Sequence, residues 1–176
     1  MLLRPAEEAD YPEIIALANV AYRGTEGAAV SWNLEIGILE GQRMDESLLR
    51  EELAEKPDGF LMTLREQEGA LLLGTFWLDP KGDGVWHLSL FMVKPEQQNR
   101  GIGRMLLAAA EEFATERGGR RMRMSVLHVR DTLNAWYERR GYRLTGETEP
   151  FPYGDDRYGR PLRDDLHFVI LEKQLS

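Results

Sequence analysis

The stretch from Leu88 to Phe113, LSLFMVKPEQQNRGIGRMLLAAAEEF, constrains the fold of this 176-residue chain more than any other. It begins as an apolar run typical of a buried strand, breaks at Pro95, and continues beyond the glycines with apolar residues at helical spacing. The glycines therefore lie at a strand-to-helix junction, where unpaired helix N–H groups and the positive end of the helix dipole face outward. Because Gly101 and Gly103 carry no Cβ, a phosphate can approach the main chain closely there. The stretch predicts an anion-binding turn.

Two other glycine motifs fit this turn poorly. The dinucleotide fingerprint needs a glycine three residues after Gly103, where the chain has Leu106. The P-loop needs Gly-Lys-Ser or Gly-Lys-Thr, and neither follows. A nucleotide or dinucleotide binder is therefore disfavoured, and a tight turn that only packs a helix on a sheet is the structural alternative.

The stretch closely resembles the acyl-CoA-binding motif of the GNAT superfamily of N-acyltransferases, Gln/Arg-x-x-Gly-x-Gly/Ala after a strand that ends in Val-x-Pro. Gln98, Gly101 and Gly103 fill the motif, and Val93 and Pro95 end the strand. The resemblance implies acetyl-CoA as cofactor, with its pyrophosphate in the glycine turn and its pantetheine arm along the main chain of the strand end. The residues so assigned are the strand end Phe91, Met92 and Val93 and the turn Gln98, Asn99, Arg100, Gly101, Ile102, Gly103 and Arg104.

The whole chain, residues 1–176, is expected to form a single α/β domain. Its apolar periods predict a strand, two helices, three antiparallel strands, a helix, a strand, a helix and two closing strands. The GNAT resemblance implies the same order: a mixed, mostly antiparallel sheet of six to seven strands, splayed at the acyl-CoA site, with about four helices packed on it. Residues 25–43 are expected to form a loop or short broken helix. Residues 150–161 are expected to form a long ordered loop.

Composition narrows the function classes. With 22 Lys and Arg against 30 Asp and Glu, the net charge of −8 disfavours nucleic acid as the main partner and suits a cationic acceptor. The lack of cysteine excludes disulfides and a cysteine acyl-enzyme and argues against a structural zinc site. The N-terminal sequence MLLRPAEE has neither a basic leader nor a long apolar run. A cytoplasmic protein without signal peptide or membrane span is therefore expected.

Direct transfer in a ternary complex is the favoured mechanism, because a thioester is already activated and no cysteine or nucleophile-elbow motif is present. The segment WYERRGY resembles the family's Leu-Tyr-Glu-x-x-Gly-Phe, whose tyrosine protonates the departing CoA thiolate, and Tyr137 stands at that position. A phenol with a pKa of about 10 is a proton donor at neutral pH. Simple packing of Tyr137 on its helix is the alternative.

Three more residues are assigned by their position relative to these motifs. His87 falls where certain relatives place a glutamate general base, and an imidazole with a pKa of about 6.5 is a competent base. A hydrogen-bonded structural histidine is the alternative. Many relatives hold CoA with an Asn seven residues before the tyrosine, but that position here is Arg130, while Asn134 lies three before it. Arg130, which can bind a phosphate, and Asn134 are both candidates for a cofactor contact.

The predicted function is transfer of an acetyl group from acetyl-CoA to a primary amine of a small molecule or peptide. A non-catalytic acyl-CoA-binding regulatory or interaction module is the alternative, in which Tyr137 would be dispensable. A homodimer is left open. Polar and aromatic residues in the two least regular segments are candidates to line the acceptor side, namely Trp32, Glu35, Arg43, Tyr153, Asp155, Asp156 and Tyr158.

Overall fold

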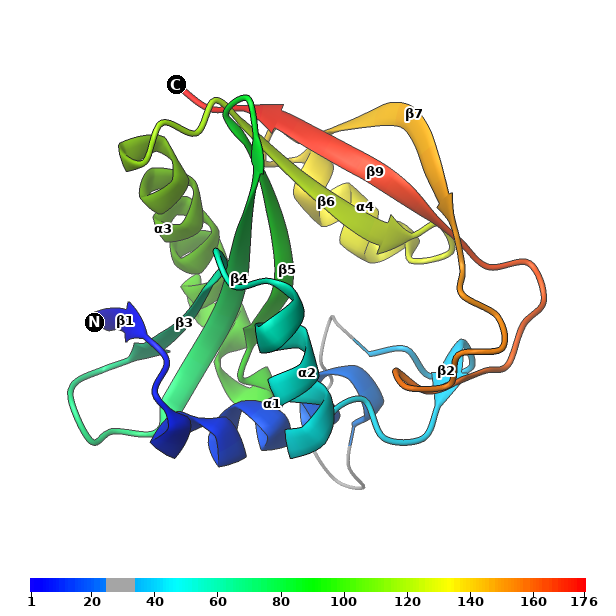
Figure 1. Cartoon of the computed structure of the whole chain (residues 1–176), viewed down its shortest axis with the longest axis horizontal. Helices are drawn as coiled ribbons and strands as arrows, with labels where there is room; N and C mark the ends of the chain where they lie inside the picture. Colours follow the sequence, from blue (N-terminus) through cyan, green and yellow to red (C-terminus); the bar gives the residue numbers. More distant parts are fainter. Residues whose placement is uncertain (25–33) are drawn as a thin grey trace.

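The computed structural model describes residues 1–24 and 34–176, apart from the side chains of Gln98 and Asn99, so Trp32 and these two side chains lie outside the described part of the chain. A central sheet carries helices on both of its faces (Figure 1). The elements follow in the order β1 (Leu2–Pro5), η1 (Glu8–Asp10), α1 (Tyr11–Arg23), β2 (Leu39–Glu40), α2 (Glu46–Glu55), β3 (Phe60–Arg65), β4 (Leu72–Gly82), β5 (Val85–Val93), η2 (Pro95–Arg100), α3 (Ile102–Glu116), β6 (Arg121–Leu127), α4 (Asp131–Glu138), β7 (Arg143–Pro150), β8 (Arg160–Pro161) and β9 (His167–Gln174), where η marks a short 3-10 helix.

The main sheet has seven strands in the spatial order β1-β3-β4-β5-β6-β9-β7. Every neighbouring pair is antiparallel except β5 and β6, which run parallel. The four α-helices and the mostly antiparallel sheet confirm the predicted mixed α/β class. The order of elements along the chain is also the predicted one, apart from the short strands β2 and β8.

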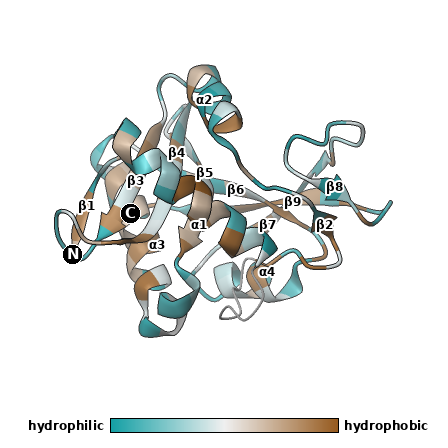
Figure 2. Ribbon diagram, turned by 90° about the horizontal axis from the view of Figure 1, so that it is seen from below, coloured by the Kyte–Doolittle hydropathy of each residue, from teal (hydrophilic) through white to brown (hydrophobic). Residues whose placement is uncertain are grey.

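Two apolar clusters cover the two faces of the sheet. One includes Phe76 of β4 and Leu106 of α3, and the other includes Trp77 of β4 and Leu49 of α2. Because side chains alternate along a strand, residues 72–79 of β4 are buried throughout. The helices show alternating hydrophobic and hydrophilic bands (Figure 2), as expected of helices packed on a sheet. Within the described residues, none of the helices has the length and apolar character that a membrane span needs.

Two predictions about loops are partly wrong. Residues 39–40 and 160–161 pair with each other as the separate ladder β2–β8, which joins the two segments expected to be irregular. The strand β7 runs from Arg143 to Pro150 along β9, so it includes the first residue of the segment 150–161 that was expected to be a loop. Every residue of β7 is exposed, so no alternation of apolar and polar residues marks the strand in the sequence. Its pairing with β9 alone shows where it ends.

The sheet opens where β5 and β6 part. Residues 85–87 of β5 pair with 121–123 of β6, and no further pairing joins the two strands. The β4–β5 ladder, in contrast, continues to Val93. Beyond His87 the edges of β5 and β6 therefore diverge (Figure 1), which confirms the predicted splay. The two strand edges that border this opening make no ladder bonds to each other.

A β-bulge lies on β5 beside this opening. The β4–β5 register shifts between Thr75 and Trp77, so that two residues of β5, Leu90 and Phe91, stand opposite one residue of β4. Leu90 has a φ of 45°, in the left-handed region that branched side chains rarely adopt. Bulges re-aim side chains and strained residues gather at functional sites. The bulge thus points to the end of β5 as part of a site.

The close approach of β4, β5 and α3 makes Gly74 a test of this packing. A Cβ on Gly74 would lie 2.8 Å from the Met92 carbonyl oxygen and 3.1 Å from Cδ2 of Leu106. We expect Gly74→Ala to lower the free energy of unfolding by roughly 2 to 3 kcal/mol, measured by urea denaturation, because backbone cannot yield without breaking the ladder. In Gly69→Ala the new Cβ meets nothing within 4 Å, so only the cost of its positive φ, about 1 kcal/mol, is expected. Equal losses in the two variants would contradict the packing argument.

Candidate active site

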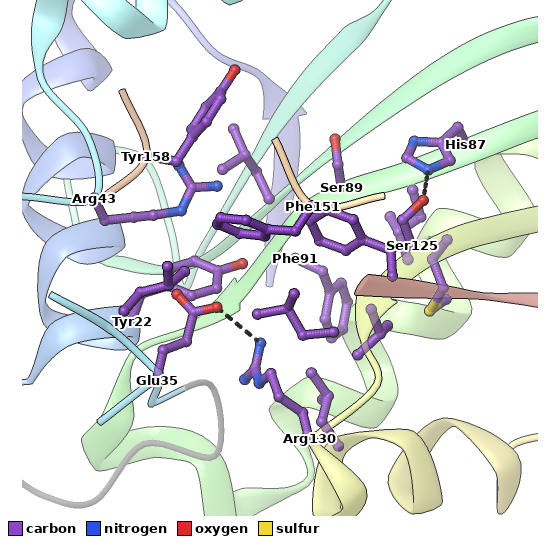
Figure 3. Close-up of a pocket in the computed structure, with 18 of the residues that line it drawn as sticks. Tyr22, Glu35, Arg43, His87, Ser89, Phe91, Ser125, Arg130, Phe151 and Tyr158 are labelled. Atoms are coloured by element: carbon purple, nitrogen blue, oxygen red, sulfur yellow. Dashed lines mark hydrogen bonds and ion pairs between the residues drawn. The ribbon is translucent and has the colours of Figure 1, made fainter. Parts of the chain in front are cut away.

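A cavity of about 290 Å³ lies in the opening between β5 and β6. Tyr22 at the end of α1, Tyr137 on α4 and residues of the chain after β7 also line it. Figure 3 shows Tyr22, Phe151 and Tyr158 around the cavity. The strand residues in its wall are Leu88, Ser89, Leu90 and Phe91 of β5 and Met124, Ser125, Val126 and Leu127 of β6. The cavity therefore lies where β5 and β6 diverge, bordered by residues of both strands.

Tyr137 is 4% exposed and lines the cavity. Its ring packs edge-on against Trp136 and Tyr142, with centroid distances of 5.2 Å and 5.7 Å. Burial raises the pKa of its hydroxyl well above the usual value, and the nearby Tyr22 adds to this effect, while Arg130 opposes it. Among the described residues no hydrogen bond to the hydroxyl is found. Tyr137 thus both packs and presents a protonated phenol to the cavity.

His87 lies at the last β5–β6 pair and also lines the cavity. Its Nε2 is 3.4 Å from the Ser125 hydroxyl, which in turn lies 3.5 Å from Oε2 of Glu149. Burial, with smaller effects of the Lys56 and Lys81 charges, lowers the pKa of His87 to about 4. His87 thus lines the cavity, but its basicity is lower than that of an ordinary imidazole with a pKa of about 6.5. The role of His87 as a base stays a prediction.

The glycine turn joins η2 to α3 at the end of β5. Gly101 has a φ of 77° and is the N-cap of α3, which has neither a side-chain cap nor an acidic residue in its first turn. Within the described residues, neither a side-chain cap nor a first-turn carboxylate compensates the positive end of α3, which suits an anion site. The Arg100 guanidinium is held 2.6 Å from Oε1 of Gln97, and Arg104 is exposed. These residues suit a pyrophosphate, and their binding role stays a prediction.

The strand end assigned to the pantetheine arm is split between the cavity and the core. Phe91 lines the cavity, whereas the side chains of Met92 and Val93 are fully buried, one in each apolar cluster. This arrangement is compatible with the assignment, because only the main chain of these residues is expected to bind the pantetheine arm. The buried side chains fix the position of the strand end beside the glycine turn.

Arg130 and Asn134 have partners within the protein. Arg130 lines the cavity, and its guanidinium lies 3.8 Å from Oε2 of Glu35, which is 6% exposed and also pairs with Arg23 at 2.5 Å. Asn134 donates to the Leu127 carbonyl at 3.4 Å and thereby holds the end of β6. The positive charge predicted to meet a phosphate is thus already opposed by a carboxylate, and the cofactor roles of both residues stay predictions.

The candidates for the acceptor side divide into two groups. Glu35 and Arg43 line the cavity with Asp155 and Tyr158, whereas Asp156 lies in a separate hollow beside β2 and β8. The Tyr153 hydroxyl donates to the Arg163 carbonyl and accepts from the Leu166 N–H, so it holds the loop in place. Sequence reasoning missed cavity residues that belong to regular elements and carry no motif, such as Tyr22, Glu52, Ser89 and Ser125.

Comparison with known proteins gives the family. Residues 28–142 match the acetyltransferase (GNAT) family. The chain is 31% identical over 134 residues to a mycothiol acetyltransferase of Rhodococcus opacus (strain B4) and 29% identical over 134 residues to that of Rhodococcus jostii (strain RHA1). Each alignment covers 66% of this chain and 43% of the relative. The chain therefore spans less than half the length of these curated relatives.

Solved structures show the same fold. The ribosomal-protein-alanine N-acetyltransferase from Brucella melitensis superposes with a TM-score of 0.66 at 22% identity, covering 99% of this chain and 100% of that one. An aminoglycoside 6'-N-acetyltransferase complexed with coenzyme A gives a TM-score of 0.67 at 15% identity, covering 100% of this chain and 98% of that one. At 22% and 15% identity, the similarity to these structures supports a shared fold and nothing beyond it.

The depressed pKa of His87 predicts how stability depends on pH. An unfolded histidine takes up a proton near pH 6.5, but His87 in the folded protein does so only near pH 4. The unfolded state therefore binds more protons between these values, and stability falls as the pH falls. Between pH 7 and pH 4 the free energy of unfolding should therefore decrease less in His87→Gln than in the wild-type protein. We expect the difference to be on the order of 2 to 3 kcal/mol, measured by denaturation at each pH. Parallel pH profiles for the two proteins would refute the buried, neutral histidine.

Proposed function

The chain belongs to the acetyltransferase (GNAT) family, and on this premise we propose that it transfers an acetyl group from acetyl-CoA to a primary amine of a small molecule or peptide, by direct transfer in a ternary complex. The observation that carries the proposal is the cavity between the diverging β5 and β6, into which the buried Tyr137 faces. Acetyl-CoA, when bound, supplies an activated thioester, so the protein has to orient two substrates and move protons.

Binding of the coenzyme is assigned to the end of β5 and the start of α3. The N-terminus of α3 has no acidic residue in its first turn, which suits a pyrophosphate. Beyond His87, β5 pairs with β4 but no longer with β6, so its β6-facing edge can take up an amide-containing arm in the way a sheet edge takes up an added strand. These two features support acetyl-CoA as the ligand.

Tyr137 is proposed to protonate the departing thiolate. Because burial keeps its pKa high, the phenol is fully protonated at neutral pH and has a proton to give. Its ring is fixed by Trp136, Tyr142 and Phe91, so the hydroxyl keeps one position relative to the strand end. A positioned acid of this kind accelerates a reaction without any covalent intermediate on the protein.

His87 is proposed to accept the proton that the amine loses. The imidazole is neutral at pH 7, since its pKa is about 4, and its low basicity means that the proton does not stay on it. Ser125 and then Glu149 lie along a path of 3.4 Å and 3.5 Å toward the exposed side of the sheet. The proton can leave the cavity along this path.

A cytoplasmic location, a single-domain extent, a homodimer and the lack of a nucleic-acid partner stay predictions.

The alternative is a coenzyme-binding module without catalysis. The low basicity of His87 favours it, because an effective general base has a pKa near the working pH. The geometry around Tyr137 favours transfer, since a module that only binds has no use for a phenol in the cavity. Turnover of any amine, measured as release of the coenzyme thiol, separates the two functions.

Binding of acetyl-CoA at the glycine turn predicts a thermal shift. A ligand that binds only the folded state raises the melting temperature, so acetyl-CoA should do so and NADH should not. In Gly103→Glu a side chain and a negative charge occupy the start of α3, and we expect the shift to vanish while the far-UV spectrum is unchanged. An unaltered affinity for acetyl-CoA in this variant would place the coenzyme elsewhere.

Removal of the Tyr137 hydroxyl tests the proposed acid. Tyr137→Phe keeps the ring and its packing, so acetyl-CoA affinity should persist while the turnover number falls by roughly 100- to 10,000-fold. Tyr142→Phe is the matched control, because the Tyr142 hydroxyl is bonded to Glu111 at 2.9 Å and Tyr142 is absent from the cavity lining. It should lose about 1 kcal/mol of stability and little turnover. Near wild-type turnover in Tyr137→Phe, with chemistry rate-limiting, rules out the assigned role.

A further inference from the structure

Arg43 is held rigidly in the wall of the cavity. The Arg43 backbone N–H donates to Oδ1 of Asn19 at 2.7 Å, which fixes the start of the side chain. The guanidinium lies over the rings of Tyr22 and Tyr158, with centroid distances of 4.9 Å and 5.2 Å (Figure 3). A guanidinium held between two rings has lost most of its rotamer freedom before any ligand binds. The side chain is therefore pre-organised for recognition.

The Arg43 guanidinium has a hydrogen-bonding group without an acceptor. Its Nη1 is buried and makes no hydrogen bond, and among the described residues no carboxylate forms an ion pair with it. Two other arginines of the fold are paired with carboxylates, Arg23 with Glu35 at 2.5 Å and Arg65 with Asp10 at 2.8 Å. Arg123 and Arg140 also have a buried Nε without a hydrogen bond, but neither residue lines the cavity. A buried charged donor without a partner is costly. Its place in the cavity wall indicates that the missing acceptor is supplied by a ligand.

The surrounding charges decide which anion fits. Glu35, Glu52 and Asp155 also line the cavity, and Glu52 is 7% exposed and hydrogen-bonded to the Tyr158 hydroxyl. Glu35 is paired with Arg23 and Asp155 with Arg157, so among the described lining residues Glu52 is the carboxylate without an ion pair. A dianionic phosphate beside Glu52 would be repelled more strongly than a singly charged group. A carboxylate needs only the one open side of the guanidinium, and an ammonium group on the same molecule is attracted by Glu52. A small zwitterion therefore matches the charges.

We propose that the acceptor is a small amino acid-like molecule whose carboxylate binds Arg43 while its amine receives the acetyl group. This inference rests on the proposed transfer to an amine and names the chemical class of the acceptor. The cavity of about 290 Å³ must also admit the acyl end of the coenzyme, so the acceptor is limited to the size of an amino acid or slightly larger. Arg43 is a specificity residue in this proposal, since it binds the acceptor away from the reacting amine.

The test compares amino acids with their primary amides, which differ in charge at one group and keep the amine. With acetyl-CoA and wild-type protein, thiol release should give a kcat/KM about 10- to 100-fold higher for the acid than for the amide. Arg43→Gln should reduce this ratio to near one, mainly through the KM of the acid. Arg43→Lys should retain part of it, because a lysine keeps the charge but not the planar fork.

Arg50→Gln is the matched control. Arg50 also lies over a tyrosine ring, that of Tyr11 at 5.3 Å, but it is outside the cavity lining and on the exposed side of α2. Its substitution should leave the preference for the acid unchanged. Melting temperatures of all variants confirm that they are folded, so that a lost preference is read as a lost contact.

The outcomes separate the inference from the proposed function. Turnover of amines with no preference for the acid, or a preference that survives in Arg43→Gln, overturns the carboxylate assignment and leaves the transfer intact. Preference for an aminoalkyl phosphonate over the matching acid overturns the choice of a singly charged anion. If no amine is turned over although acetyl-CoA binds, the proposed function fails. In that case the binding of amino acids to the wild-type protein and to Arg43→Gln is measured by calorimetry. Equal binding to the two proteins, or no binding to either, overturns the inference.

Discussion

The early end of the β5–β6 ladder is the constraint on which the rest of the site depends. Three residue pairs join the two parallel strands, and beyond His87 the strands separate while β5 stays bonded to β4. A gap in a sheet leaves main-chain groups unpaired and is stable only where side chains or a ligand fill it. Here α1, α4 and the chain after β7 close over the gap and form the cavity. The bulge at Leu90 bends the strand that borders it.

Burial in this cavity acts on two titratable groups with opposite results. It disfavours the charged form of each, so the pKa of Tyr137 rises and that of His87 falls to about 4. The phenol therefore holds its proton, and the imidazole does not take one up at neutral pH. One physical cause thus produces a proton donor and a neutral, weakly basic group in the lining of one cavity. Neither value follows from the residue type alone.

Buried ion pairs fasten the less regular segments to the sheet. Arg23 at the end of α1 bonds Glu35 and the carbonyls of Gly41 and Tyr158, so a single side chain joins three parts of the chain. Glu35 in turn faces Arg130 at the start of α4. Because each charge has an opposite partner, the cost of desolvation is offset. The same network supports the loop that carries Tyr158 and so the position of Arg43.

The sequence by itself determined the order of elements, because apolar periods are local properties of the chain. The turn QNRGIG, which is also local, carried the family resemblance, and that resemblance implied the splayed mixed sheet. It also placed Tyr137 and His87, whose positions are counted from that turn and from WYERRGY. It could not show β7, whose residues are all exposed, or the β2–β8 ladder, which joins residues far apart in the chain. Only the tertiary structure decided three further properties. Arg130 faces Glu35, the pKa of His87 is lowered, and Nη1 of Arg43 is buried without a hydrogen-bond acceptor. These properties depend on burial and on partners from other elements, which no local pattern records.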